Sequence, residues 1–88
     1  MEIIYTNKRI EKFITNLDNN VVSRIERMFD LLEKYGYELE MPHSKSLGRG
    51  LFELRVLGEQ SIRILYVFVN NKIYIVHIFF KKTQRISK

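Results

Sequence analysis

The sequence predicts an α+β domain in which an N-terminal strand and a helix hairpin pack on one face of a small antiparallel sheet. Two patterns indicate this class. Apolar residues recur at helical spacing over residues 10–35, whereas residues 51–80 form short runs of β-branched and aromatic residues with a period of two. A length of 88 residues, 45% of them hydrophobic, suffices for one modest core. The whole chain, residues 1–88, is therefore expected to be a single domain.

The N-terminal half is expected to form a short strand followed by two helices. Residues 2–6 have the apolar centre typical of a strand. The next segment has apolar residues at positions i, i+3, i+4 and i+7, which predicts a helix from about Lys8 to the polar cluster at residues 18–20. A second amphipathic helix follows, with Asn20 as its cap and Gly36 as its stop. The short link makes the two helices a hairpin.

The C-terminal half is expected to form three strands after a connector at residues 37–50. The connector contains the only proline of the chain and two of its glycines. The strands are predicted at residues 51–56, 62–69 and 73–80. Asn70 and Asn71 separate the last two, and both residue types tolerate positive φ angles, which suits a type I′ hairpin turn.

The register of the first of these hairpins follows from the faces of its strands. Apolar residues of both strands must face the helices, which pairs Val56 with Ile62. Arg55 is then directly opposite Arg63 on the exposed face. Like charges in that position are destabilising, so the pair is expected to hold either a carboxylate, with Glu53 two residues away, or an anionic ligand.

The last strand is expected to add a third basic group to this face. A two-residue turn pairs Tyr66 with Ile75 and, further along, Ile64 with His77. The residues that this register leaves on the arginine face are Ile78, Phe80 and Lys82. A face that unites two guanidinium groups and an ammonium group can bind a phosphodiester and stabilise the extra negative charge of its transition state.

The net charge of +5 is unevenly distributed along the chain. Residues 1–40 carry six Lys and Arg against eight Asp and Glu, whereas residues 41–88 carry nine against two. A one-sided field of this kind suits a polyanion such as RNA or DNA, or an acidic protein segment. The alternative is solvated surface charge, with the arginines in ordinary ion pairs with Glu53 or Glu59.

Two side chains are candidates for proton transfer, His77 and Glu53. His77 is the only histidine inside a predicted strand, and an imidazole can act as a general acid or base. The two-residue turn favours a core position for His77, whereas a three-residue turn would place it beside Arg63. Glu53 shares the arginine face. His43 lies in the connector and is expected to be solvated.

Composition excludes several classes of function. The chain has no cysteine, hence no disulfide, thiolate zinc site or cysteine nucleophile, which fits a cytoplasmic location. Its apolar runs, such as residues 73–80, are far too short to cross a bilayer, and its N-terminus lacks the features of a secretory signal. No His, Asp or Glu pair has metal-ligand spacing, and no glycine-rich phosphate loop occurs, so neither a metal nor a cofactor is expected.

Four segments carry the signature of a family. They are Ser44-Lys45-Ser46-Leu47, Gly50-Leu51-Phe52-Glu53-Leu54-Arg55, Arg63-Ile64-Leu65-Tyr66 and His77-Ile78-Phe79-Phe80-Lys81-Lys82-Thr83. In this order, after a strand and a helix hairpin, they resemble the RelE/ParE toxin superfamily, and within it the HigB-like, phage-derived branch. The resemblance covers nearly the whole chain and implies a RelE-like fold.

The resemblance implies the toxin of a type II toxin–antitoxin pair. Such toxins include ribosome-dependent, metal-independent endoribonucleases that cleave translated mRNA, the ribose 2′-hydroxyl attacking the adjacent phosphate. By position, Arg63 resembles the strand arginine that contacts the scissile phosphate, and Arg55 and Lys82 match basic positions of the family. Glu53 and His77 are the candidate proton-transfer groups. The further basic residues expected to contact RNA are Lys45, Arg49, Lys81 and Arg85.

The partners implied by the resemblance are a cognate antitoxin, a small helix-turn-helix protein, and mRNA on the ribosome. An apolar strip beside the arginines suits an acidic amphipathic segment of the antitoxin; its members are Leu65, Val67, Ile78 and Phe80. Two departures keep an alternative open. The chain stops soon after its paired lysines, without the C-terminal helix or catalytic tyrosine common in the family, and the superfamily includes ParE toxins, which bind DNA gyrase and are not nucleases. The alternative is a non-nuclease binder, either a gyrase inhibitor or a degenerate toxin that binds only its antitoxin.

Overall fold

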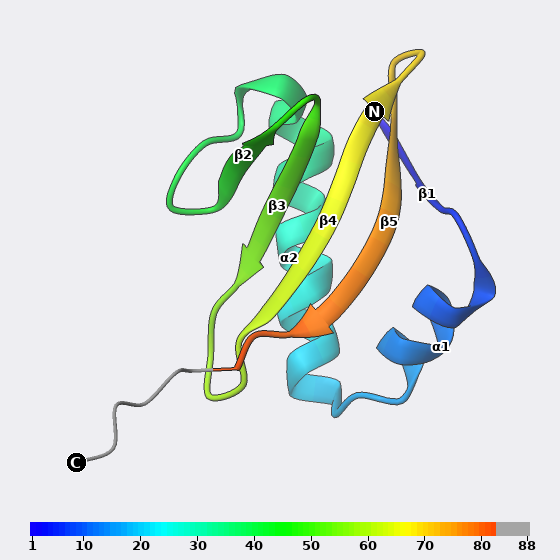
Figure 1. Cartoon of the computed structure of the whole chain (residues 1–88). Coiled ribbons are helices and arrows are strands. Elements are labelled where there is room, and N and C mark those ends of the chain that lie inside the picture. The colour runs from blue at the N-terminus through cyan, green and yellow to red at the C-terminus, as the bar shows by residue number, and fades with distance from the viewer. Residues whose placement is uncertain (83–88) are drawn as a thin grey trace.

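The computed structural model describes residues 1–82 as one sheet with two helices (Figure 1). The elements in chain order are β1 (Glu2–Tyr5), α1 (Lys8–Thr15), α2 (Asn19–Tyr35), a 3₁₀ turn η1 (Gly36–Glu38), β2 (Ser44–Gly48), β3 (Leu51–Val56), β4 (Ile62–Val69) and β5 (Lys72–Phe80). The strand order in the sheet is β1-β5-β4-β3-β2. Neither described helix is both long and apolar enough to cross a membrane.

The α+β class with helices on one face of the sheet is confirmed, and one feature of the sheet differs from the prediction. Figure 1 shows α2 behind the strands and α1 beside it near β5. β1 pairs parallel with β5, so the sheet is mixed rather than antiparallel. The direction of β1 was not predictable, because the sequence of a four-residue strand does not indicate whether it pairs parallel or antiparallel.

Both helices begin and end close to the predicted positions. The side chain of Asn7 caps α1 by accepting a hydrogen bond from the backbone N–H of Ile10, 3.1 Å away. The N-cap of α2 is Asp18 rather than Asn20, because Asn20 already lies inside the first turn of the helix. Gly36 ends α2 with a φ of 53°, a conformation that glycine adopts without strain.

The connector contains a strand that was not predicted. Ser44–Gly48 forms the edge strand β2, antiparallel to β3. Gly48, Arg49 and Gly50 close this hairpin with positive φ angles. The buried Ser44 hydroxyl forms a hydrogen bond with the Tyr66 hydroxyl on β4 and so ties the edge of the sheet to its centre.

The core lies between the sheet and the helices, and its residues come from α1, α2, β3, β4 and β5. The fully enclosed members include Ile25, Leu32, Leu54, Ile62, Ile64, Ile73 and Ile75. Aromatic pairs extend the core at its edges, with Tyr5 against Phe29 and Phe13 against Phe80, whose ring centroids are 6.3 and 5.1 Å apart. The opposite face of the sheet has no covering layer among the described residues.

The β3–β4 register is confirmed, with Val56 opposite Ile62 and Arg55 opposite Arg63. The type I′ turn is also supported, because Asn70 and Asn71 have φ angles of 50° and 63°.

The β4–β5 register changes part-way along the strands. Tyr66 pairs with Ile75 as predicted, but Leu65 pairs with His77, which leaves Val76 as an extra residue in β5. Such a bulge exchanges the two faces of the strand beyond it. The predicted pairing of Ile64 with His77 is therefore wrong, because Ile64 pairs with Ile78.

The bulge moves two predicted members of the arginine face to the helix side. Ile78 is buried in the core, and Phe80 lies opposite Ile62 with its ring against Phe13. Phe79 takes their place, directly opposite Arg63.

Candidate functional site

Arg55 and Arg63 form the centre of the candidate site. They lie directly opposite each other on β3 and β4, on the face of the sheet that points away from the helices. The Nε atoms of both arginines are 3.7 Å from the same oxygen, Oε1 of Glu53. The expected carboxylate partner is thus Glu53, and it serves both arginines at once. Two guanidinium groups against one carboxylate leave this cluster with a formal charge of +1.

The two guanidinium groups are enclosed but incompletely bonded. Arg63 is only 7% exposed, and its Nη1 donates a long hydrogen bond of 3.4 Å to the carbonyl of Ile62. Arg55 directs Nη1 to the sulfur of Met41 at 3.7 Å, and its buried Nε has no hydrogen-bond partner within residues 1–82. Buried donors of this kind nearly always have a partner, so the site has unused capacity for an anion.

Glu53 and His77 lie in one row across the sheet, on either side of Leu65. Glu53 is opposite Leu65 on β4, and Leu65 is opposite His77 on β5. The core position favoured for His77 is therefore wrong: the imidazole is exposed on the arginine face, because the bulge at Val76 turns it outward. Its ring lies 5.4 Å from that of Phe79.

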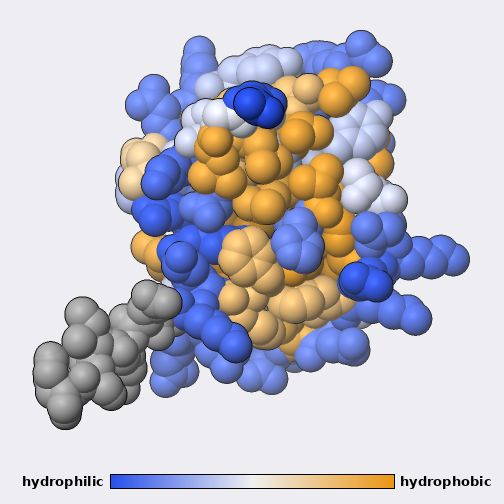
Figure 2. Space-filling model, in the orientation of Figure 1, coloured by the Kyte–Doolittle hydropathy of each residue, from blue (hydrophilic) through white to orange (hydrophobic). Residues whose placement is uncertain are grey.

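The arginine face continues into an apolar surface over β4 and β5. Figure 2 shows apolar side chains gathered in the middle of this face, with hydrophilic side chains around them. The partly exposed residues of this surface are Leu65, Val67, Tyr74, Val76 and Phe79. The predicted strip thus keeps its members from β4, Leu65 and Val67, and changes those from β5.

The remaining basic residues lie at different distances from the arginine pair. Lys45 is exposed on β2 directly opposite Glu53. Lys81 and Lys82 follow β5 and are exposed, and the backbone N–H of Lys81 continues the pairing by donating to the carbonyl of Ser61 at 2.8 Å.

The placement of Lys82 on the arginine face assumed an unbroken β5. With the bulge, alternation from Phe79 instead points to Lys81.

One residue assigned to RNA binding, Arg49, is not brought to the arginine pair. Arg49 lies at the tip of the β2–β3 hairpin, at the far end of β3 from Arg55. At about 3.3 Å per residue, the two are separated by on the order of 15 Å or more. Arg85 lies outside the described residues.

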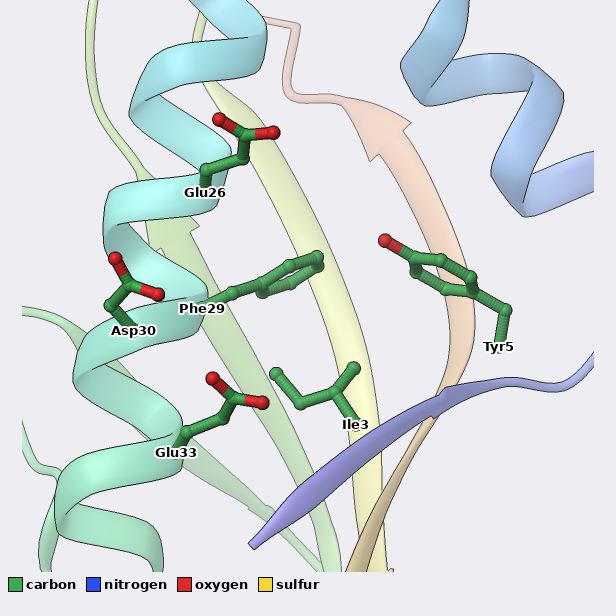
Figure 3. Close-up of a pocket in the computed structure, with 6 residues that line it drawn as sticks. All are labelled: Ile3, Tyr5, Glu26, Phe29, Asp30 and Glu33. Atoms are coloured by element: carbon green, nitrogen blue, oxygen red, sulfur yellow. The ribbon is translucent and has the colours of Figure 1, made fainter.

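A hollow elsewhere in the structure is acidic, in contrast to the basic arginine face. It is a trough of about 400 Å³ on the helix side, with carboxylates from α2 along one wall and residues of β1 along the other (Figure 3). The lining residues are Ile3, Tyr5, Glu26, Phe29, Asp30 and Glu33. Burial, with the negative charges of Glu11 and Glu26, raises the pKa of Tyr5. Its three carboxylates disfavour an anionic ligand in this trough.

The described residues hold no group of three or more His, Cys, Asp or Glu side chains arranged to bind a metal ion. Sequence reasoning missed Phe79 and the contact of Met41 with Arg55. The two glycines around Arg49 were a usable signal for the β2–β3 hairpin, because short hairpin turns need positive φ angles, which glycine adopts readily.

Residues 12–88 match the family model described as Phage derived protein Gp49-like (DUF891). The chain belongs to the Gp49-like family. No curated protein matches it in sequence. The match spans the second half of α1, all of α2 and every residue of the arginine face, so the candidate site lies within the Gp49-like region.

Solved toxin structures share the fold of this Gp49-like chain. A YoeB–YefM complex from Staphylococcus aureus contains a chain with a TM-score of 0.69 and 17% identity, covering 93% of this chain and 98% of that one. A YoeB/ParE toxin from Agrobacterium tumefaciens has a TM-score of 0.67 and 13% identity, covering 93% and 100%. The family match and the shared fold confirm the resemblance to the RelE/ParE superfamily.

Proposed function

We propose that this protein is the toxin of a type II toxin–antitoxin system and cleaves mRNA on the ribosome. The observation that carries the proposal is the arrangement of Glu53, Arg63 and His77. Arg63 lies on the central strand of the three, and the two proton-transfer candidates lie on the strands to either side. The shared fold of YoeB toxins supports the proposal at the level of architecture.

The spacing of this arrangement suits a phosphodiester. Neighbouring strands are about 4.8 Å apart, so the backbones of Glu53 and His77 are separated by about 10 Å across β4. Glu53 and His77 flank Leu65, which is two residues along β4 from Arg63, so a phosphate held by Arg63 over Leu65 would have a carboxylate on one side and an imidazole on the other. In-line attack on phosphorus needs the base and the acid on opposite sides of the phosphate, and this arrangement supports that geometry.

The reaction proposed for this site is attack of the ribose 2′-hydroxyl on the adjacent phosphorus. Glu53 accepts the proton of the 2′-hydroxyl as the bond from O2′ to phosphorus forms. His77 in its protonated form gives a proton to O5′ as the bond from phosphorus to O5′ breaks. The products are a 2′,3′-cyclic phosphate and a 5′-hydroxyl. The guanidinium groups of Arg55 and Arg63 stabilise the charge that develops on the phosphoryl oxygens.

The remaining basic residues are assigned to holding the RNA chain. Lys45 lies on β2, and the exposed Lys81 and Lys82 directly follow β5, so these lysines flank the arginine pair on two sides. Ammonium groups bind phosphates as point charges without reading sequence. The partly exposed Tyr74 and Phe79 offer aromatic surfaces on which bases can stack.

The partner proposed for the free protein is an antitoxin with an acidic amphipathic segment. The uncovered surface over β4 and β5 combines apolar side chains with arginines, and such a segment complements both. Several structures that share this fold are complexes of YoeB with YefM.

Induction of the protein in a bacterial host tests the nuclease proposal. We expect growth arrest together with new mRNA 5′ ends at codon positions of translated messages. The Arg63→Ala variant should show neither, whereas Arg27→Ala, which changes an exposed arginine on α2, should behave as the wild type. Growth arrest without new ends would favour a gyrase-directed toxin, and no arrest would favour a protein that binds only its antitoxin.

A further inference from the structure

We propose that the carboxylate of Glu53 is the resident anion of the arginine pair, and that the phosphate of the ligand displaces it. The inference rests on the proposed function in taking the phosphate to be that of RNA and Glu53 to be the base of the reaction. Its basis is the single oxygen, Oε1, that lies 3.7 Å from the Nε atoms of both Arg55 and Arg63. Glu53 therefore occupies the position at which an anion would meet both guanidinium groups.

The arginine pair needs an anion in this position even when no ligand is bound. Arg55 and Arg63 are directly opposite across β3 and β4, where side chains start only about 5 Å apart. Arg63 is 7% exposed, so water screens its charge poorly. Without a counter-charge the two guanidinium groups would repel each other at close range. Glu53 neutralises one of the two charges and allows the pair to form before any ligand arrives.

The same contacts are loose enough to be exchanged. Both distances of 3.7 Å exceed the length of a hydrogen bond, and the Nε of Arg55 has no hydrogen-bond partner among residues 1–82. A phosphate oxygen that approached to hydrogen-bond distance would satisfy this donor better than Glu53 does.

A carboxylate that leaves the pair also has a second cation within reach. Lys45 is directly opposite Glu53 on β2 and is exposed. Lys45 on the edge strand can therefore pair with the Glu53 carboxylate when a phosphate takes its position beside the arginines.

Displacement gives Glu53 a role beyond that of a proton acceptor. A phosphodiester carries one negative charge, and the phosphorane formed by attack of the 2′-oxygen carries two. When Glu53 takes the proton from the 2′-hydroxyl it becomes neutral, and the cluster charge rises from +1 to +2 in the same step. The cluster charge of +2 then balances the two negative charges of the phosphorane. In the resting protein, the cluster charge of +1 balances the single negative charge of the phosphodiester.

The test is phosphate binding by purified Glu53→Gln protein, with Glu59→Gln as a control of equal charge. Glu59 is exposed in the loop between β3 and β4 and has no place in the site. Without phosphate, Glu53→Gln should have a lower Tm than the wild type. Inorganic phosphate should bind to it roughly three- to tenfold more tightly and raise its Tm by more than it raises that of the wild type or of Glu59→Gln. Equal or weaker phosphate binding by Glu53→Gln would overturn the proposal.

A measurement on the wild-type protein covers the case in which Glu53→Gln does not fold. During a phosphate titration, the Nε resonances of Arg55 and Arg63 and the carboxyl carbon resonance of Glu53 should shift with one dissociation constant. Arginine shifts without any change at Glu53 would show that phosphate binds beside the carboxylate and does not replace it. These experiments contain neither ribosome nor message, so the displacement of Glu53 by phosphate can be shown even if the protein does not cleave mRNA. Equally, a failure of the displacement would not contradict cleavage of mRNA.

Discussion

Arg55 and Arg63 lie directly opposite each other on β3 and β4, and each holds its Nε 3.7 Å from the same oxygen of Glu53. Hairpins normally avoid two like charges in such a pair. Here the pair lies on a sheet face with no covering layer among the described residues, beside an apolar surface and within one row of His77. We interpret this relationship as the centre of a phosphate-handling site.

Arg63→Lys should lower cleavage of translated mRNA by about 10²-fold or more while retaining the charge. A lysine presents one ammonium point charge, whereas the guanidinium plane presents several donors in fixed directions, and the loss of one preorganised donor costs about this much. The check is the cleavage rate in a purified translation reaction, beside Arg27→Lys. An unchanged rate for Arg63→Lys would show that charge alone suffices at this position.

His77→Gln should reduce cleavage by about 10²- to 10⁴-fold and leave the free energy of unfolding almost unchanged. The imidazole is exposed, so its replacement removes a proton donor without opening the core. His43→Gln, in the loop before β2, serves as the matched control. Loss of stability without loss of cleavage would mean that His77 is a structural residue after all.

Phe79→Ala and Phe80→Ala should have opposite effects, because the bulge at Val76 decides which ring faces the ligand. Phe80→Ala removes the contact with Phe13 and should cost about 1–2 kcal/mol of stability. Phe79→Ala should weaken RNA binding or cleavage with a smaller effect on stability. Urea unfolding and cleavage assays on both variants decide the matter, and the reverse pattern would indicate an unbroken β5.

Tyr66→Phe should change the dependence of stability on alkaline pH. Burial raises the pKa of Tyr66 above its usual value near 10, with the Ser44 hydrogen bond acting in the opposite direction. Because the folded-state pKa is the higher one, the stabilisation is complete below about pH 10 and is lost as pH rises through the folded-state value.

The variant should therefore be less stable than the wild type by about 1 kcal/mol at pH 8, from loss of the hydrogen bond. This gap should narrow as the pH approaches 11, since phenylalanine does not ionise. Urea unfolding at both pH values measures this difference in the free energy of unfolding. A difference that stays constant with pH would argue against titration of Tyr66.

The regular parts of the fold were predictable because local patterns decide them. The helical spacing of Ile10, Ile14, Ile25 and Phe29 indicated the buried faces of α1 and α2. The β3–β4 register followed from the alternation of faces, because a shift of one strand by one residue would turn either Arg55 or Arg63 toward the helices. The pairing of Arg55 with Arg63 and the place of Glu53 on the same face were therefore predicted correctly.

The irregular parts of the fold were missed because the residues that form them do not show a clear strand pattern. β5 is apolar on both faces, so Ile75, Val76 and Ile78 give no alternation that would reveal a bulge. Every residue after the bulge was consequently assigned to the wrong face, His77 included. β2 has the polar start Ser44-Lys45-Ser46, which resembles a loop until its pairing with β3 is seen.

The most direct test is cleavage of a defined message in a translation reaction assembled from purified components. With wild-type protein, we expect the message to be cut only while ribosomes translate it, leaving a 2′,3′-cyclic phosphate and a 5′-hydroxyl at each cut. Arg27→Ala should give the same cuts and Arg63→Ala none. A message that stays intact under translation with folded wild-type protein, or cuts that persist in folded Arg63→Ala, would contradict the assignment of the arginine face as an mRNA-cleaving site.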